Sequence, residues 1–341
     1  MRAGKTAFIT GITGQDGTLL AAFLLGKGYA VHGLVRWDCV DSSKHLENVH
    51  LHYGDMNDAM SIVRLLTEIQ PDEIYNLAAL THVHVSFDTP ASTFSANAMG
   101  ALHVLEAARI LKLPVRIYQA SSSEMFGSAP APQDEETKFE PCSPYGVAKL
   151  AAYWMARSYR EAYGMHISNG ILFNHESTLR GENFVTRKIT RGVAAIEAGR
   201  QSEILLGNLE SLRDWGHAKD FVRGMWMMLQ REKPDDYVLA TGETRSVRAF
   251  AEAAFAHIGA RLLWHGAGVH EVGKDSRTGK IVVRIDETLF RPKEVHHLCG
   301  DATKAREKLG WQPIISFEEL VAEMVNEDRA SLREASWQKT G

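Results

Sequence analysis

Cysteine is scarce in this sequence, and neither a long basic run nor a long apolar stretch occurs in it. The only cysteines are Cys39, Cys142 and Cys299, which lie far apart and show no CxxC spacing. This number and spacing argue against a disulfide framework and against a structural metal site. The formal net charge is -4, so the electrostatic footprint of a nucleic-acid-binding protein is absent. We therefore expect reduced thiols, no metal and no nucleic-acid partner.

The apolar stretches are also too short for a membrane protein. None approaches the roughly 18 residues that a membrane span needs, and the N-terminus leads directly into a β-branched segment without the apolar core of a signal peptide. We expect a cytoplasmic protein that does not bind a membrane. Its 341 residues, 45% of them hydrophobic and 23% charged, are typical of a globular chain with one large domain or two smaller ones.

Three glycines spaced three apart follow the first apolar segment. Thr6 to Thr10 is short and β-branched, and Gly11, Gly14 and Gly17 precede a helical pattern. A strand, a glycine turn and a helix favour a dinucleotide site, because glycines let the backbone approach a pyrophosphate and the helix N-terminus offers unpaired N–H groups. The alternative is a tight turn that binds nothing.

The residue after the second expected strand, 30–35, bears on the choice of dinucleotide. An acidic residue there binds the ribose 2′-hydroxyl of NAD. This sequence has Arg36 instead, which suits a 2′-phosphate, so NADP is favoured over NAD. Because the acidic Asp38 is close to this position, NAD remains an alternative cofactor. The alternative interpretation of Arg36 is a solvated charge in a loop, with no role in cofactor binding.

Apolar and helical segments alternate through the first half of the chain. Strands separated by helices of about 10 to 15 residues predict an α/β fold with a Rossmann-type doubly wound parallel sheet. We assign residues 1–175 to this dinucleotide-binding domain, which a strand and a helix from the second half rejoin. Residues 176–341 are less regular and predict a smaller mixed α/β substrate domain, partly interleaved with the first. Within it, residues 272–286 carry charges and glycines that predict an exposed hairpin.

Ligands of such sheets bind at the carboxyl ends of the strands. Asp55, residues 77–81 and residues 121–124 each follow an expected strand, so we expect them to line one crevice. Asn97 opens the next helical pattern, where it could brace a backbone group or cap the helix.

Tyr145 and Lys149 are four residues apart in a helical pattern, which places a phenol and an ammonium on one face. The ordinary pKa of a tyrosine is about 10, and a neighbouring ammonium together with an oxidised nicotinamide favours the phenolate. We expect a lowered pKa for Tyr145, which would make it a general base. Packing of an aromatic ring beside a solvated lysine is the alternative.

The chain contains longer motifs over nearly its whole length. Through these motifs it resembles the extended short-chain dehydrogenases/reductases and, more closely, the GDP-mannose 4,6-dehydratase family. The longer motifs of the second half are much more specific than the glycine spacing. The motifs are GITGQDG (11–17), HLHYGD (50–55), QASSSE (119–124), SPYGVAKLAAYW (143–154), NGILFNHES (169–177), FVTRKI (184–189), RDWGHAKD (213–220), FRPKEV (290–295) and KLGWQP (308–313).

The resemblance implies a hydro-lyase that converts GDP-D-mannose to GDP-4-keto-6-deoxy-D-mannose and water. In the family, the C4 hydroxyl loses its proton to a tyrosine and its hydride to a tightly bound NADP. The resulting ketone acidifies the hydrogen at C5. A carboxylate then removes that proton and protonates the departing C6 hydroxyl, after which the hydride returns to C6, so the cofactor is recycled.

Carried over residue by residue, the resemblance implies four catalytic residues. Tyr145 is the base at O4, Lys149 orients the ribose and lowers the pKa of that tyrosine, and Ser122 forms a hydrogen bond to O4. Glu124 is the acid and base at C5 and C6. Epimerases and reductases of the superfamily lack this carboxylate.

The glycine motif, the strand ends and the resemblance together imply a set of binding residues. Arginines suit a diphosphate because the guanidinium fork binds two oxygens at once; ion pairs between the domains are the alternative for the charged members. The expected cofactor contacts are Gly11, Thr13, Gly14, Gln15, Asp16, Gly17, Arg36, Asp55, Met56, Leu77, Ala78, Ala79, Thr81, Tyr145, Lys149, His175 and Arg180. The expected GDP-sugar contacts are Ser86, Ser122, Glu124, Asn174, Lys188, Arg213, Arg291 and Glu294.

Several positions depart from the family pattern. Ser122 stands where a threonine is usual, Ser92 where a tyrosine is common, and Thr178 where a proline follows NHES. Trp37 replaces a second arginine, and the loop after it is shorter. These departures leave open a related substrate such as GDP-manno-heptose. They also leave open whether the chain is a homodimer, which we expect, or a homotetramer.

Two further functions are less favoured. A nucleotide-sugar epimerase or reductase would not need Glu124, and a catalytically silent NADP-binding scaffold would need only the glycine turn. The presence of Ser122, Glu124, Tyr145 and Lys149 together argues against both.

Overall fold

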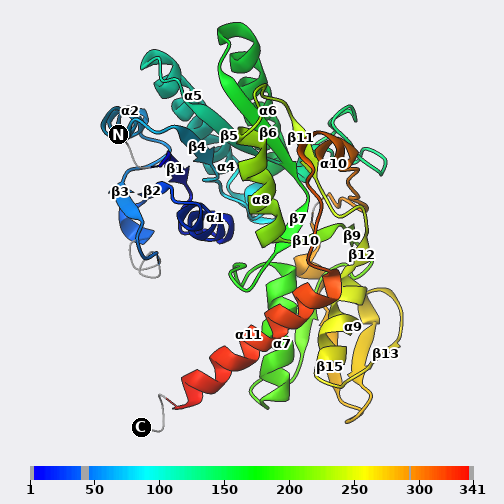
Figure 1. Ribbon diagram of the computed structural model, residues 1–341. Helices are drawn as coiled ribbons and strands as arrows, with labels where there is room; N and C mark the ends of the chain where they lie inside the picture. The colour runs from blue at the N-terminus through cyan, green and yellow to red at the C-terminus, as the bar shows by residue number, and fades with distance from the viewer. Residues whose placement is uncertain (1–3, 40–45, 292, 338–341) are drawn as a thin grey trace.

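The central element of the protein is a seven-stranded parallel sheet. The computed structural model describes residues 4–39, 46–291 and 293–337, with side chains as far as residue 333. The strand order is β11-β6-β5-β4-β1-β2-β3, and every neighbouring pair is parallel (Figure 1). The predicted Rossmann-type sheet is thereby confirmed. The strands are β1 (Thr6–Thr10), β2 (Ala30–Val35), β3 (His50–Tyr53), β4 (Glu73–Asn76), β5 (Arg116–Ser122), β6 (His166–Leu172) and β11 (Tyr237–Leu239).

Helices cover both faces of this sheet, which explains why β1 and β4 are buried along their whole length. On one face, α1 (Gln15–Gly26) packs beside α8 (Ala218–Leu229), whose Met225 and Met228 are fully buried. The opposite face carries α2 (Ala59–Ile69), α5 (Gly100–Ile110) and α6 (Pro144–Tyr163). Strand order reverses between β1 and β4, and ligands of such sheets bind at this point.

Segments from the second half of the chain complete the sheet. Strand β11 pairs with β6 at the outer edge, and α8 reaches the same layer as α1 (Figure 1). The motif at 169–177 covers the end of β6 and all of β7 (Asn174–Glu176), because the chain leaves the main sheet there and pairs with β10 (Trp215–His217).

A second, mixed sheet has the order β13-β14-β15-β8 and its own hydrophobic core. The predicted hairpin at residues 272–286 is present as β14–β15, but it lies inside this sheet and is not an exposed excursion. Val282 and Val283 lie in the core, while Arg277 and Lys280 are exposed in the turn. The elements of this region are α7 (Val185–Glu197), β8 (Ile204–Leu206), α9 (Val247–His257), β13 (Leu262–His265), β14 (Val272–Asp275), β15 (Ile281–Ile285) and α11 (Phe317–Trp337).

The remaining elements are short. Strands β9 (Leu212–Arg213) and β12 (Arg245–Ser246) form an antiparallel pair. A continuous helical stretch before α5 contains a π-helical turn. The other elements are α3 (Val85–Asp88), α4 (Pro90–Phe94), η2 (Ser95–Met99), η3 (Ser123–Met125), η4 (Gly268–His270), η5 (Glu287–Leu289) and α10 (Thr303–Leu309).

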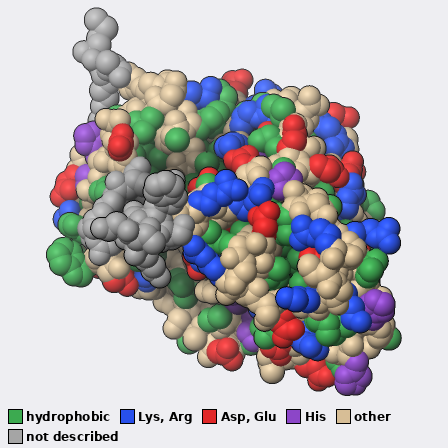
Figure 2. Space-filling model, turned by 90° about the horizontal axis from the view of Figure 1, so that it is seen from below, with side chains coloured by type: hydrophobic (Ala, Val, Ile, Leu, Met, Phe, Trp, Pro, Cys, Tyr) green, Lys and Arg blue, Asp and Glu red, His purple; other side chains and the backbone are tan. Residues whose placement is uncertain are grey.

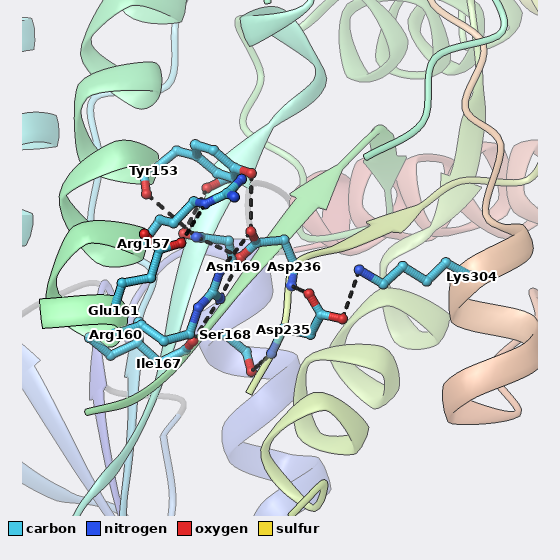
Figure 3. Close-up of polar contacts among 11 residues, drawn as sticks. Tyr153, Arg157, Arg160, Glu161, Ile167, Ser168, Asn169, Asp235, Asp236 and Lys304 are labelled. Atoms are coloured by element: carbon cyan, nitrogen blue, oxygen red, sulfur yellow. Dashed lines mark hydrogen bonds and ion pairs between the residues drawn. The ribbon is translucent and has the colours of Figure 1, made fainter. Parts of the chain in front are cut away.

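A buried polar network joins α6 to strands β6 and β11 (Figure 3). The Asp236 carboxylate, next to β11, accepts two hydrogen bonds from Arg160 of α6, at 2.7 and 2.9 Å. It also accepts hydrogen bonds from Tyr153 at 3.1 Å and from the Asn169 amide at 2.9 Å. These contacts hold α6, which carries Tyr145 and Lys149, against the sheet.

Charge is not segregated on the face seen in Figure 2. Lysine and arginine side chains alternate there with acidic ones. Among the described residues, no helix combines the length and the apolarity that crossing a membrane requires, and no group of three or more His, Cys, Asp and Glu side chains is arranged to hold a metal ion.

Candidate active site

A cavity of about 800 Å³ opens at the carboxyl ends of the sheet strands and extends to the second sheet. The three strand-end segments expected to share a crevice all line it: Asp55, residues 77–81 and residues 121–124. With the exception of Ser86, every residue predicted to bind the cofactor or the sugar nucleotide also lies in its wall.

The glycine turn forms one end of the cavity. Gly11 has a φ of 71° and lies against Ala78, where a Cβ atom on Gly11 would come within 2.9 Å of the Ala78 backbone. A Cβ atom on Gly17 would lie 2.3 Å from the Gly11 carbonyl oxygen. Gly14 caps α1, and no side chain caps the N–H groups of that helix end. The turn therefore presents unoccupied donors to the cavity, which fits the pyrophosphate of a dinucleotide.

Asn97 positions the neighbouring wall. Its amide accepts a hydrogen bond from the Leu80 N–H at 2.7 Å and donates one to the Leu80 carbonyl at 3.0 Å. It is thus a brace and not a helix cap, because it lies within η2, in the middle of a helical stretch. At the start of the same wall segment, residues 77–81, the Thr10 hydroxyl accepts hydrogen bonds from the N–H groups of Leu77 and Ala78, both at 3.1 Å.

Arg36 stands directly beyond β2 at the edge of the cavity. Its side chain is 52% exposed and lies 3.2 Å from Asp38. The Arg36 guanidinium therefore has N–H donors left for an anion, and Asp38 competes with that anion only at the surface. The shortened loop that follows falls largely on residues 40–45, outside the described residues.

Asp16 and His175 form a partly buried ion pair of 2.8 Å beside the glycine turn. Burial opposes both charges, but the His175 imidazolium holds the pKa of Asp16 below its ordinary value, and the Asp16 carboxylate raises the pKa of His175. The His175 ring also stacks on Phe221. The pair joins the N-terminus of α1 to β7.

The four predicted catalytic residues come together from two adjacent elements. Ser122 and Glu124 lie at the end of β5 and in η3, and the Ser122 hydroxyl accepts a hydrogen bond from the Glu124 N–H at 3.2 Å. Tyr145 and Lys149 lie on the first turns of α6. The Tyr145 phenol is hydrogen-bonded to Ser122, and the Lys149 ammonium donates to the Ala120 carbonyl at 3.0 Å.

The protein by itself does not lower the pKa of Tyr145. Burial, opposed by the Ser122 hydrogen bond and reinforced by the Glu124 carboxylate, raises it to about 12. Burial also lowers the pKa of Lys149 to about 8. The expected lowering of the Tyr145 pKa included an oxidised nicotinamide, so it stays a prediction for the cofactor-bound enzyme; a phenolate requires that additional positive charge.

Charged side chains surround Glu124. One of its oxygens lies 3.2 Å from Arg291 Nη1, while the other is buried and has no hydrogen-bond partner among the described residues. Arg213 is only 6% exposed and forms no ion pair with a described carboxylate. Burial lowers its pKa to about 10. Two guanidinium groups thus face the cavity beside one half-satisfied carboxylate, an arrangement suited to an anionic substrate.

Comparison with known proteins shows the family. The family model for GDP-mannose 4,6 dehydratase matches residues 8–324. The chain belongs to this family. It is 54% identical to GDP-mannose 4,6-dehydratase of Sinorhizobium fredii over 96% of this chain and 98% of the relative. It is 49% identical to GDP-mannose 4,6 dehydratase of Homo sapiens over 96% of this chain and 92% of the relative.

Solved structures with lower identity share the fold of this dehydratase-family chain. UDP-glucose 4-epimerase of Thermotoga maritima, solved with UDP-glucose, has a TM-score of 0.82 at 22% identity and matches 96% of this chain and 99% of its own. RMD of Pseudomonas aeruginosa, solved with NADPH, has a TM-score of 0.76 at 20% identity, with the same coverage of both chains.

Ser86 is the predicted substrate contact that the structure of this dehydratase-family chain does not bring to the cavity. Its hydroxyl donates to the Val83 carbonyl at 2.6 Å and accepts from the Tyr145 N–H at 3.2 Å. It therefore braces the first turn of α6 instead of facing a ligand. Arg180 lines the cavity but is paired with Glu176 at 3.0 Å and lies over the Phe184 ring.

The structure also adds wall residues for which sequence reasoning gave no role. Most of them come from the second half of the chain, in loops, in strand β8 and in η5. Apart from Phe184, which lies in the FVTRKI motif, they belong to none of the motifs named above. They include His82, Asn183, Phe184, Leu205, Leu206, Gly207, Asn208, Ser211 and Leu289.

The motif RDWGHAKD carries structural as well as cavity residues. Asp214 is buried and accepts hydrogen bonds from the N–H groups of Thr241, Gly242 and Gly300. Asp220 accepts from the N–H groups of Ile314 and Ile315. Its acidic residues thus hold backbone segments of the second half of the chain together, and Arg213 faces the cavity itself.

Proposed function

We propose that this chain is a GDP-mannose 4,6-dehydratase, a hydro-lyase that converts GDP-D-mannose to GDP-4-keto-6-deoxy-D-mannose and water. The observation that carries the proposal is the position of Glu124. Its carboxylate is buried, has one oxygen without a hydrogen-bond partner among the described residues, and lies in the same cavity wall as Ser122 and Tyr145. Sequence identity of about half over nearly the full length of established dehydratases supports the same reaction.

The pair of Tyr145 and Ser122 acts at C4 of the sugar. A nicotinamide cofactor bound in the cavity supplies the two-electron acceptor at C4 and the donor at C6. Ser122 holds the C4 oxygen by a hydrogen bond, and Tyr145, already hydrogen-bonded to Ser122, takes the C4 hydroxyl proton. Lys149 is anchored on the Ala120 carbonyl, so its remaining N–H donors are available to orient a ribose.

Glu124 carries out the elimination. Once C4 is a ketone, the hydrogen at C5 is acidic enough for a carboxylate to remove. Glu124 takes that proton and gives it to the oxygen leaving C6, so one water departs and the carboxylate is regenerated. When the hydride returns to C6, C5 regains a proton, which balances the one that O4 lost. The absence of a partner on its second oxygen suits this use, because an oxygen already accepting hydrogen bonds is a weaker base.

Cations on the second side of the cavity bind the diphosphate. Arg213 is buried without a carboxylate partner among the described residues, and Arg291 lies at the cavity wall. Lys188 is half-buried there, and burial lowers its pKa. The buried Asn174 side-chain oxygen has no described partner and is available to a sugar hydroxyl.

The cofactor that fits best is NADP, bound tightly and recycled. The uncapped N-terminus of α1 and the close-packed glycines accommodate a pyrophosphate. Arg36 supports the 2′-phosphate, because its half-exposed guanidinium has donors free beyond Asp38.

We further propose that the enzyme is a cytoplasmic homodimer. Helices α5 and α6 and the turn η2 carry large apolar side chains with more than a third of their surface exposed: Met99, Ile110, Val147, Trp154 and Tyr163. A second copy covering these helices would bury them. The three cysteines are free thiols, which suits a reducing compartment.

Incubation of the purified protein with GDP-mannose tests the reaction. Mass spectrometry is expected to show a product lighter by one water. Glu124→Gln, of nearly equal size, is expected to lower water loss by about 10² to 10⁴-fold, the usual contribution of general acid–base catalysis. A product of unchanged mass would indicate an epimerase, and dehydration of GDP-manno-heptose alone would identify the related substrate. Normal water loss by Glu124→Gln would remove that residue from the mechanism.

A further inference from the structure

His82 connects two segments of the cavity wall that are far apart in the sequence. It belongs to residues 77–84, which follow β4, and it contacts Asn183 and Phe184, which follow β7; both segments contribute residues to the wall. The rings of His82 and Phe184 have centroids 5.6 Å apart, and the His82 ring is hydrogen-bonded to the Asn183 backbone. We call these contacts of His82 with Asn183 and Phe184 the clasp.

Both ring nitrogens of His82 are used within the protein. Nδ1 accepts a hydrogen bond from the Val85 N–H at 3.3 Å. The proton of the neutral ring is therefore on Nε2, which leaves this atom to donate to the Asn183 backbone. Burial lowers the pKa of His82, opposed by the Asn183 hydrogen bond, and so favours the neutral ring. The ring nitrogens of His82 thus serve contacts between protein groups.

Two further contacts attach the same segments to the glycine turn. On one side, Gly11 lies against Ala78, where a Cβ atom on Gly11 would come within 2.9 Å of the Ala78 backbone. On the other side, the Ser177 hydroxyl donates to the Gln15 side chain at 2.9 Å. Together with the clasp at His82, these contacts form a closed ring around the part of the cavity beside the glycine turn. A dinucleotide whose pyrophosphate lies on that turn is enclosed by this ring.

The two sides of the clasp are anchored to the rest of the fold. Phe184 lies under the Arg180 guanidinium, whose Cζ is 3.6 Å from the ring centroid, and Arg180 is paired with Glu176 of β7 at 3.0 Å. On the other side, Asn97 holds the Leu80 backbone by two hydrogen bonds. Residues 181–183, between the anchors, are exposed. The contact with His82 is therefore what holds this exposed tip over the cavity.

We propose that His82 closes the ring of contacts over the bound dinucleotide and slows the exchange of that dinucleotide with solvent. The proposal rests on the proposed function, which places a recycled dinucleotide in this cavity. Between removal of the C4 hydride and its return to C6, the enzyme must keep the reduced dinucleotide in place, because its loss would leave the 4-keto sugar without a hydride donor. His82 is thus a positioning residue, which acts through a contact between two protein segments.

His82→Asn is designed to break the clasp alone. The shorter side chain keeps an oxygen that accepts from the Val85 N–H, but it is too short to span to Asn183 and Phe184. Because the clasp joins protein groups, its loss is expected to raise both the association and the dissociation rate of NADPH. We expect an increase of about 5 to 30-fold in each, as for the loss of one hydrogen bond and one ring contact, and a nearly unchanged Kd. Stopped-flow fluorescence measures association of NADPH with the cofactor-free protein, and a chase with excess NADP measures dissociation.

His84→Asn is the matched control. His84 lines the same cavity two residues further along, and among the described residues its ring has no contact with residues 181–184. Its substitution is expected to leave both rates as in the wild type. Unchanged rates for His82→Asn, or an equal acceleration by His84→Asn, would overturn the clasp. A raised Kd with an unchanged association rate would also overturn it, since His82 would then bind the dinucleotide directly.

A double variant tests the contact itself. Phe184→Ala is expected to accelerate dissociation of NADPH, and its combination with His82→Asn is expected to release NADPH no faster than the faster single variant, because both substitutions break one contact. Effects that multiply would overturn the clasp.

The same measurements separate the clasp from the proposed function. If the rates change as expected but GDP-mannose loses no water, the dehydratase function fails and the clasp stands. If water loss is normal and His82→Asn exchanges NADPH as the wild type does, the clasp alone fails. A wild type that binds no NADPH overturns both.

Discussion

Gly146 lies against the backbone of Glu124. A Cβ atom at Gly146 would approach the Glu124 carbonyl oxygen to 2.6 Å. This contact joins the first turn of α6 to η3, and it brings the Tyr145 phenol and the Glu124 carboxylate into one wall. The distance between Tyr145, which acts at C4, and Glu124, which acts at C5 and C6, therefore depends on the absence of a side chain at Gly146.

Gly146→Ala is expected to separate the two elements. Overpacking in a buried contact costs about 1 to 3 kcal/mol of stability, and a displacement of about 1 Å among catalytic groups can cost about 10²-fold in rate. Urea unfolding and steady-state kinetics measure the two effects. Gly26→Ala is the control, because no atom lies within 4 Å of a Cβ at that position. Equal kinetics for wild type and Gly146→Ala would show that the contact does not position the site.

Arg36→Gln is expected to change the choice of cofactor. The substitution removes a charged donor that lies at the cavity edge, so affinity for NADP should fall by about tenfold or more, as for the loss of a charge-assisted hydrogen bond. Affinity for NAD should change little, because NAD has no 2′-phosphate. Calorimetric titration of the cofactor-free protein with each dinucleotide measures both. A parallel loss for NADP and NAD would contradict the assignment.

The pKa shifts of Asp16 and His175 predict the pH range in which this pair stabilises the fold. The folded pKa of His175 is raised from 6.5, so its contribution is complete below that value and is lost as pH rises through the folded pKa. The folded pKa of Asp16 is lowered from 3.8, so its contribution is present above that value and is lost as pH falls through the folded pKa. The stability difference between wild type and His175→Gln should therefore be largest between about pH 4 and 6.5. Urea unfolding across pH measures it, and a difference independent of pH would show that the pair is not ionised.

Much of the fold followed from the sequence because its signals are local. Buried parallel strands such as Thr6–Thr10 give continuous apolar runs, and the glycine turn marks the helix that follows. The hairpin at residues 272–286 was predicted, but its charges and glycines suggested that it is exposed, whereas Val282 and Val283 face a core that only the neighbouring strands create.

The catalytic residues were recognisable because they lie in compact motifs at the end of β5 and the start of α6. The ion pair of Glu124 with Arg291 was not, since it joins segments 167 residues apart and depends on how the two sheets meet. The raised pKa of Tyr145 has the same origin, because burial and the nearby Glu124 carboxylate are properties of the assembled cavity. Ser86 was assigned to the sugar by resemblance, yet its hydroxyl is used within the protein.

The fate of the hydrogen at C4 tests dehydration by this site most directly. The holoenzyme is incubated with GDP-mannose deuterated at C4, in ordinary water, and the product is examined by mass spectrometry and NMR. The mechanism predicts a product lighter by one water that retains the deuterium, now at C6, and formation of this product by Glu124→Gln that is about 10² to 10⁴-fold slower. A product that has lost the deuterium to solvent, or one of unchanged mass, would contradict it.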